Sequence, residues 1–122
     1  MDALSHRAHG AFDYIFVAVL ALAPLLLPLG PVAALICYTV AIAHLVLSLL
    51  TDYPLGAARI LPFSVHGALE ALTAGFLIAA PWLFGFSEPM APRAFFVGSG
   101  LTLGVVWLLT SFRPTRPAQA AE

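Results

Sequence analysis

The sequence predicts an all-α integral membrane protein, a bundle of four transmembrane helices formed by two tandem helical hairpins of the same orientation. Composition, four long apolar runs and an internal repeat predict this fold. Of the 122 residues, 61% are apolar and 9% are charged, whereas an ordinary soluble domain has about 45–50% apolar and about 25% charged residues. A small soluble domain could not bury so much apolar surface, so the solvent of this chain is lipid.

Four apolar segments, at about residues 10–29, 32–50, 67–86 and 94–112, are candidate transmembrane helices. Such a helix needs about 20 apolar residues, because the hydrocarbon is about 30 Å thick and each residue rises about 1.5 Å. A Pro-Leu-Gly-Pro turn at 28–31 separates the first two segments, and a short stretch with Ser87 and Glu88 separates the last two. We therefore expect two tight helical hairpins.

The two hairpins share a repeated sequence. HGAFDYIFVAVLALAPLLLPLG, from residue 9, aligns without gaps with HGALEALTAGFLIAAPWLFGFS, from residue 66, and the His-Gly pairs, the acids and the prolines coincide. The second helices both end in Leu-Leu-Thr, at 49–51 and 108–110. These matches predict repeats at about 9–56 and 66–113 in a single transmembrane domain, 1–114, followed by a disordered tail, 115–122. An even number of spans in each repeat gives both copies the same orientation.

The orientation follows from the arginines. The connection 51–65 holds Tyr53 beside Arg59 and two prolines, and we expect it to lie along the membrane surface. The far side holds only Arg93, whereas the side of both termini holds Arg7, Arg59, Arg113 and Arg116. The positive-inside rule then predicts cytoplasmic N- and C-termini.

The tripeptide Ala80-Pro81-Trp82, near the outer end of the third apolar segment, resembles the motif of the SPW-repeat family of small bacterial membrane proteins. The resemblance covers about residues 9–112. Alanine replaces the serine of the motif in both copies, and the first copy lacks the tryptophan. The resemblance implies a four-helix, multi-pass protein of the bacterial inner membrane, and it brings no established activity.

Each repeat places a histidine four residues before an acid, His9 before Asp13 and His66 before Glu70. This spacing puts both side chains on one helix face, one turn apart. If the two helices meet across a pseudo-twofold axis, two imidazoles and two carboxylates converge at the cytoplasmic end. Such a set suits a divalent metal or a proton relay.

The same pairs also have a purely structural explanation. Acids in the first turn of a helix are stabilised by the helix macrodipole and can satisfy free N–H groups. Arg7 or Arg59 could also pair with either acid. In this interpretation the two pairs separately anchor two helices at the interface, and the sequence leaves both interpretations open.

His44 lies about 10 Å inside the second segment, on a small and polar face with Cys37, Ala41, Ser48 and Thr51. This face should contact protein and not lipid. A hydrogen bond to Asp13 and haem ligation are the two alternatives for His44. Leu103 occupies the corresponding position of the second repeat, which disfavours a symmetric bis-histidine haem.

Gly98, Gly100 and Gly104 in the fourth segment have the small-xxx-small spacing that lets two helices approach closely. We expect them to pack against the second helix or against another protein.

Composition also limits the function. The net charge is −1 and no lysine is present, so no basic field exists for nucleic acid. No nucleophile, phosphate loop or metal motif is recognisable, so we expect neither enzymatic activity nor a cofactor.

The leading prediction is a non-enzymatic membrane protein that acts through helix association, as an accessory, assembly or self-oligomerising component. Its partners would be the lipid bilayer and a membrane protein or a second copy. A small proton- or cation-linked transporter or channel that uses Asp13, Glu70 and His44 is the first alternative. A haem- or metal-binding redox protein that uses His9, His66 and His44 is the second.

Overall fold

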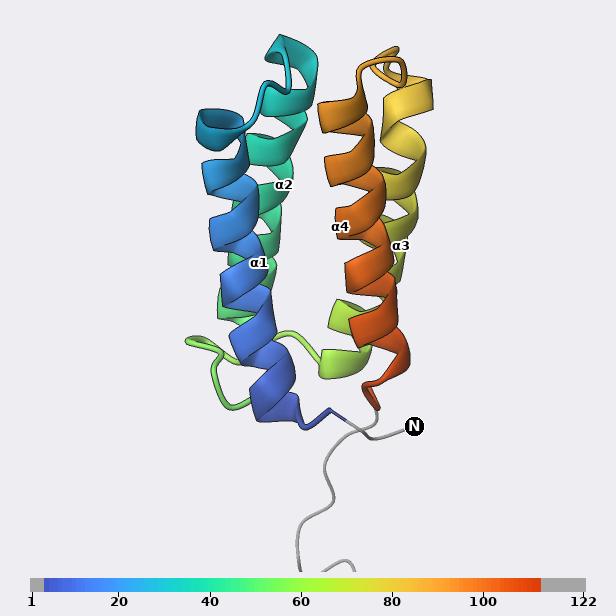
Figure 1. Cartoon of the computed structure of the whole chain (residues 1–122). Helices are drawn as coiled ribbons and strands as arrows, with labels where there is room; N and C mark the ends of the chain where they lie inside the picture. The colour runs from blue at the N-terminus through green and yellow to red at the C-terminus, as the bar shows by residue number, and fades with distance from the viewer. Residues whose placement is uncertain (1–3, 113–122) are drawn as a thin grey trace, which may run out of the picture.

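The computed structural model describes residues 4–112 and contains four α-helices within them. They are α1 (His6–Leu26), α2 (Pro31–Leu50), α3 (Phe63–Leu83) and α4 (Met90–Leu108). They form two antiparallel hairpins that stand side by side (Figure 1). All four are long and apolar enough to cross a membrane, which confirms the predicted helical class. The predicted tail, 115–122, lies outside the described residues, as does the last residue of the predicted second repeat, Arg113.

Prolines and caps set the helix ends, which differ from the predicted bounds. The α1 helix begins four residues earlier than expected, because the Ser5 hydroxyl accepts a hydrogen bond from the N–H of Ala8, at 3.1 Å. Pro24 and Pro81 each lie two residues before the end of their helix. A proline lacks the N–H of the helical ladder and its ring crowds the preceding turn, so both helices end soon after it. Pro92 lies in the first turn of α4, where a proline is tolerated.

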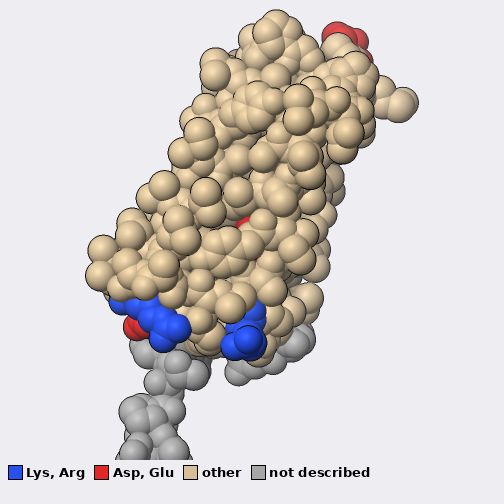
Figure 2. Space-filling view, turned by 90° about the vertical axis from the view of Figure 1, so that its left-hand side faces the viewer, with Lys and Arg blue, Asp and Glu red and all other residues tan. Residues whose placement is uncertain are grey.

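The helices pack closely within each hairpin and much more loosely between the hairpins. Leu20, Leu77, Phe96 and Leu103 form the fully buried centre of the apolar core. The outward faces are also apolar, since Leu26, Leu35, Leu72 and Leu108 are each between 64% and 75% exposed. Figure 2 shows one such face, which carries charged side chains almost only at its two ends. A surface of this kind is typical of a protein surrounded by lipid.

Gly100 is a place where α4 lies very close to α3. A Cβ atom there would lie 2.6 Å from Cγ1 of Ile78 and 2.7 Å from the carbonyl oxygen of Ala74. A Cβ at Gly98 or Gly104 would have no neighbour within 4 Å. The structure therefore places Gly100 against α3 and not against α2, and gives the other two glycines no packing partner among the described residues.

The connection between α2 and α3 is exposed over most of its length, but Tyr53 within it points inward and Leu55 lies against α1. The Tyr14 hydroxyl of α1 donates to the carbonyl of Leu55, at 2.8 Å, and Leu55 packs over Gly10. Arg59 donates to the carbonyls of Gly56 and Pro54 in the same loop. This folding brings Tyr53, which is 3% exposed, into the interior and differs from the predicted interfacial position of that residue.

Candidate functional site

Four ionisable side chains converge between the two hairpins. His9 and Asp13 come from α1, His66 and Glu70 come from α3, and all four are fully buried. One nitrogen or oxygen atom from each lies within 4.8 Å of the others. The two His-acid pairs thus form one cluster, which we call the His-acid cluster.

The acids of this cluster are not helix-terminal groups. Asp13 and Glu70 lie seven residues after the helices begin at His6 and Phe63, and the first turns contain no acid. Arg7 is exposed and Arg59 binds its own loop, so within residues 4–112 both acids pair only with histidines. These positions differ from the expectation of first-turn anchoring with an arginine partner.

Each histidine of the cluster approaches the acids of both helices. Oε2 of Glu70 lies 2.9 Å from Nε2 of His9 and 2.9 Å from Nε2 of His66. Oδ2 of Asp13 lies 3.1 Å from Nε2 of His66, and Oδ1 lies 3.4 Å from Nε2 of His9. The cluster therefore joins the two hairpins at a level where helix packing between them is loose.

Two threonines hold the outer nitrogens of these rings. Nδ1 of His9 lies 2.8 Å from Oγ1 of Thr110, and Nδ1 of His66 lies 2.8 Å from Oγ1 of Thr51. Both threonines follow the matching Leu-Leu pairs of the sequence. Each histidine is thus oriented by a threonine that follows the second helix of the other hairpin.

Asp13 has two further partners. Nε2 of His44 lies 3.0 Å from Oδ1 of Asp13, so the interhelical hydrogen bond suggested by the sequence is present. The Tyr53 hydroxyl donates to Oδ2 of Asp13, at 2.9 Å. Burial and the Asp13 carboxylate raise the pKa of Tyr53, which keeps the phenol a neutral donor.

Glu70 is less fully bonded than Asp13. Its Oε2 atom serves both histidines, whereas its Oε1 atom is buried and has no hydrogen-bond partner among the described residues. An unpartnered carboxylate oxygen in a dry interior is costly. This oxygen is available to a ligand of positive charge.

Aromatic rings close the cluster toward the end of the bundle that carries the chain termini. The Phe112 ring lies on Gly67, where a Cβ would approach it to 2.6 Å, and packs on Phe63 with ring centroids 4.7 Å apart. Phe63 also packs edge-on against His9, at 5.3 Å. Leu55 covers Gly10 in the same way. The lack of space for a side chain therefore explains why a glycine follows each histidine.

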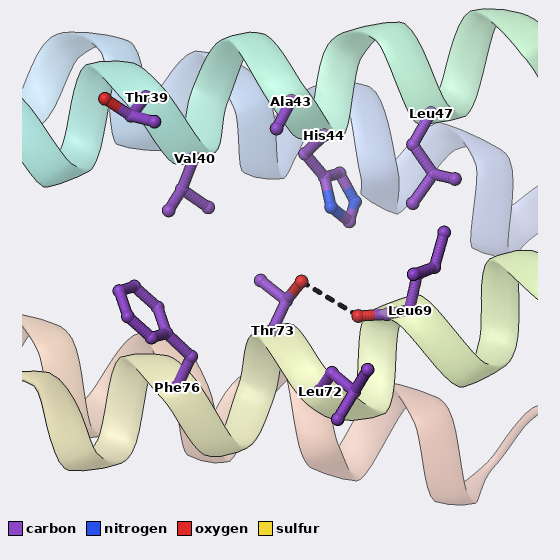
Figure 3. A pocket seen from close by; sticks show the side chains of 9 residues that line it. All are labelled: Thr39, Val40, Ala43, His44, Leu47, Leu69, Leu72, Thr73 and Phe76. Atoms are coloured by element: carbon purple, nitrogen blue, oxygen red, sulfur yellow. Dashed lines mark hydrogen bonds between the residues drawn. The ribbon is translucent and has the colours of Figure 1, made fainter.

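A cavity of about 350 Å³ lies beside the cluster, between α2 and α3. Figure 3 shows the His44 ring pointing from α2 into the space between these helices, among mostly apolar side chains. Thr39 and Thr73 also line it, but each hydroxyl donates to a carbonyl of its own helix. This cavity suits an apolar occupant, and the His-acid cluster is the part of the described structure that suits a cation.

Comparison with known proteins finds no matching family model, no similar curated protein and no similar solved structure. The resemblance to the SPW-repeat family thus stays a prediction. The functional argument depends on the geometry of the cluster alone.

That geometry favours cations. Two carboxylates are buried without an arginine or lysine partner among residues 4–112. Charge uncompensated in a medium of low dielectric constant is strongly unfavourable, so positive charge must accompany them. Protons on the imidazoles or a bound metal ion would supply it.

The sequence did not predict two polar residues of this site, Tyr53 and Thr110, and placed Thr51 only on a polar face that contacts protein. Tyr53 gave no signal, because its loop position suggests an interfacial tyrosine. Thr51 and Thr110 gave a weak signal of a shared role, because they end the two matching Leu-Leu-Thr stretches.

Proposed function

We propose that the protein is a small cation-linked transporter or channel of the bacterial inner membrane. In this proposal, protons or metal ions bind at the His-acid cluster and His44 takes part. The observation that carries it is the burial of Asp13 and Glu70 among histidines, with no arginine or lysine partner among residues 4–112. The acids of the cluster lie about 10 Å along α1 and α3 from the first residues of these helices, and the histidines lie about 5 Å along them. Ionisable groups at such depth mark ion or proton pathways in membrane proteins.

The membrane arrangement belongs to the same proposal. Exposed leucines along all four helices support insertion in lipid. Arg7 and Arg59 lie at the end of the bundle near the cluster, whereas Arg93 begins the helix at the opposite end. The positive-inside rule then orients the cluster toward the cytoplasm. The matching His-acid pairs and threonines support an origin by duplication.

Helix association is a second candidate function. The lack of any neighbour at Gly98 and Gly104 supports it, because a second helix could approach α4 closely there. An accessory or self-oligomerising role of this kind is compatible with cation transport.

For the alternative of a redox protein, the geometry supports a bound metal ion better than a bound haem. The carboxylates of Asp13 and Glu70 occupy the space between the imidazoles of His9 and His66. A porphyrin between these rings would have to displace both carboxylates.

Flux measurements test the transport proposal. The full chain is reconstituted in liposomes that contain a pH indicator or a metal-sensitive dye, and a proton or Mn²⁺ gradient is imposed. We expect flux in the wild-type protein and its loss in the double variant Asp13→Asn, Glu70→Gln, because the buried carboxylates attract the cation.

The control for this experiment is Glu88→Gln, which neutralises an exposed acid at the opposite end. Circular dichroism and size-exclusion chromatography show whether each variant is folded. Absence of flux in the wild type, or equal flux in a folded double variant, would contradict the transport proposal.

A further inference from the structure

We infer that the His-acid cluster is a binding site for one divalent transition-metal ion. Its ligands are Nε2 of His9, Nε2 of His66 and carboxylate oxygens of Asp13 and Glu70. This inference depends on the proposed cation function and names the class of cation.

The first argument is the hydrogen-bond direction at the threonines. The Thr110 hydroxyl donates its only hydrogen to the carbonyl of Val106, at 2.7 Å, and the Thr51 hydroxyl donates to that of Leu47, at 2.6 Å. Each hydroxyl oxygen can therefore only accept from Nδ1 of its histidine. In a neutral ring the hydrogen is then on Nδ1, and Nε2 directs a lone pair toward the carboxylates.

This arrangement is typical of a metal-bound histidine. Such a residue commonly donates its outer N–H to a nearby acceptor, which fixes the tautomer and the ring orientation. The lone pair on Nε2 of His9, the lone pair on Nε2 of His66 and the two carboxylates would otherwise repel one another across 2.9–3.4 Å. A cation among them turns this repulsion into attraction.

The second argument is the spacing of the ligand atoms. Two atoms that each lie about 2.1 Å from an ion are about 3.0 Å apart at a right angle and about 3.4 Å apart at a tetrahedral angle. The closest nitrogen-oxygen distances in the cluster are 2.9, 2.9, 3.1 and 3.4 Å. The nitrogen–oxygen spacing therefore suits an ion of this size, and the ligand atoms of all four residues lie within 4.8 Å of one another.

The third argument is independent of the first two. Oε1 of Glu70 is buried and has no hydrogen-bond partner within residues 4–112, although every other carboxylate oxygen of the cluster has one. A bound ion would give Oε1 a partner, and two carboxylates would balance two positive charges. Two imidazoles with two carboxylates favour Zn²⁺, Mn²⁺, Fe²⁺ or Co²⁺ over Mg²⁺ and Ca²⁺, which prefer oxygen ligands alone.

The test uses the purified full chain in detergent, treated with a chelator and titrated with Co²⁺. Visible absorption bands report the ligand set, and metal analysis gives the stoichiometry. We expect one Co²⁺ per chain, with a spectrum of nitrogen and oxygen ligands, and we expect Zn²⁺ to displace it. Glu70→Gln should abolish this binding.

A substitution outside the ligand set keeps the test valid if Glu70→Gln fails to fold. Thr110→Val removes the acceptor of the His9 Nδ1–H and should weaken Co²⁺ binding about 10–100-fold. Thr110→Ser keeps the acceptor and should bind like the wild type. His6→Gln, a change in a histidine outside the cluster, should also leave the affinity unchanged.

Three results would overturn the metal site: no stoichiometric binding, an unchanged affinity in a folded Thr110→Val variant, or an equal loss in His6→Gln. If Co²⁺ does not bind but proton flux depends on Asp13 and Glu70, the transported cation is the proton and the proposed function stands. If that flux is also insensitive to the two acids, both proposals fail.

Discussion

Tyr53 connects the loop between α2 and α3 to the buried cluster. Its hydroxyl donates to Asp13 at 2.9 Å, and its ring packs against Phe63 and His66, both with centroids at 5.5 Å. The loop therefore contributes a donor that neither hairpin supplies. Because it neutralises no charge, Tyr53 orients the Asp13 carboxylate and leaves its negative charge in place.

Replacement of Tyr53 by Phe should destabilise the protein by about 1.5–3 kcal/mol, because it removes a hydrogen bond to a buried carboxylate. Thermal unfolding in detergent measures the change. Tyr38→Phe is the matched control, since Tyr38 is 39% exposed. An equal effect of the two substitutions would show that the hydroxyl of Tyr53 contributes nothing.

The difference in the free energy of unfolding between the wild type and Tyr53→Phe should depend on pH in a definite direction. The pKa of Tyr53 is raised in the folded protein, first by burial and then by Asp13. The stabilisation by the Tyr53 hydroxyl is therefore fully present below about pH 10, the pKa of tyrosine in the unfolded chain. It is lost as the pH rises through the pKa of Tyr53 in the folded protein. The difference between wild type and Tyr53→Phe should stay constant from about pH 6 to about pH 9.

The packing of α3 against α4 includes one very close approach, at Gly100. Gly100 lies against Ile78 and the backbone of Ala74, whereas Gly104, one turn later, meets nothing within 4 Å. Helices of apolar residues in lipid associate through such van der Waals contact, because hydrophobic burial adds little there. Of the three glycines in the small-xxx-small pattern, only Gly100 thus takes part in the close packing of the second hairpin within the described residues.

Gly100→Ala should destabilise the second hairpin by about 1–3 kcal/mol, because the added methyl group overlaps Ile78 and the Ala74 carbonyl. Gly104→Ala should be neutral or stabilising by up to about 1 kcal/mol, since alanine favours the helix. Unfolding in mixed micelles with increasing SDS compares the two. If Gly104→Ala is the more harmful change, another molecule packs on that side of α4.

In the whole molecule, the polar His-acid cluster connects two apolar hairpins. Contacts within each hairpin are dense, and the contact between the hairpins is loose apart from the cluster and its threonines. A cation bound at the His-acid cluster, as proposed, would therefore act on the association of the hairpins. Charged side chains elsewhere gather toward the ends of the bundle, as Figure 2 shows for one face.

Reporter fusions test the proposed orientation. A reporter after Glu122 should be active in the cytoplasm, and one inserted in the turn at Glu88 should be active in the periplasm, because the arginines favour the cytoplasmic side. Insertion after Asp52 is the internal control and should match the C-terminal fusion. A periplasmic signal from Glu122 would reverse the orientation and place the cluster at the outer face.

Local patterns in the sequence predicted a large part of the fold. Apolar runs gave the four helices, and helical spacing put each histidine on the same face as its acid, because both features depend on neighbours in the chain. The helix starts were displaced by four residues at α1, α3 and α4, since polar residues or a proline in each first turn interrupt the apolar signal.

The site itself was decided by contacts between residues far apart in the sequence. The amino-acid order already contains the components: two His-acid pairs, His44, two matching threonines and the glycines beside the histidines. The packing of the hairpins adds that both pairs share one buried cluster, that Tyr53 turns inward, and that Oε1 of Glu70 has no partner among residues 4–112. The reason is physical: helix spacing fixes which groups share a face, whereas the packing of two hairpins fixes which faces meet.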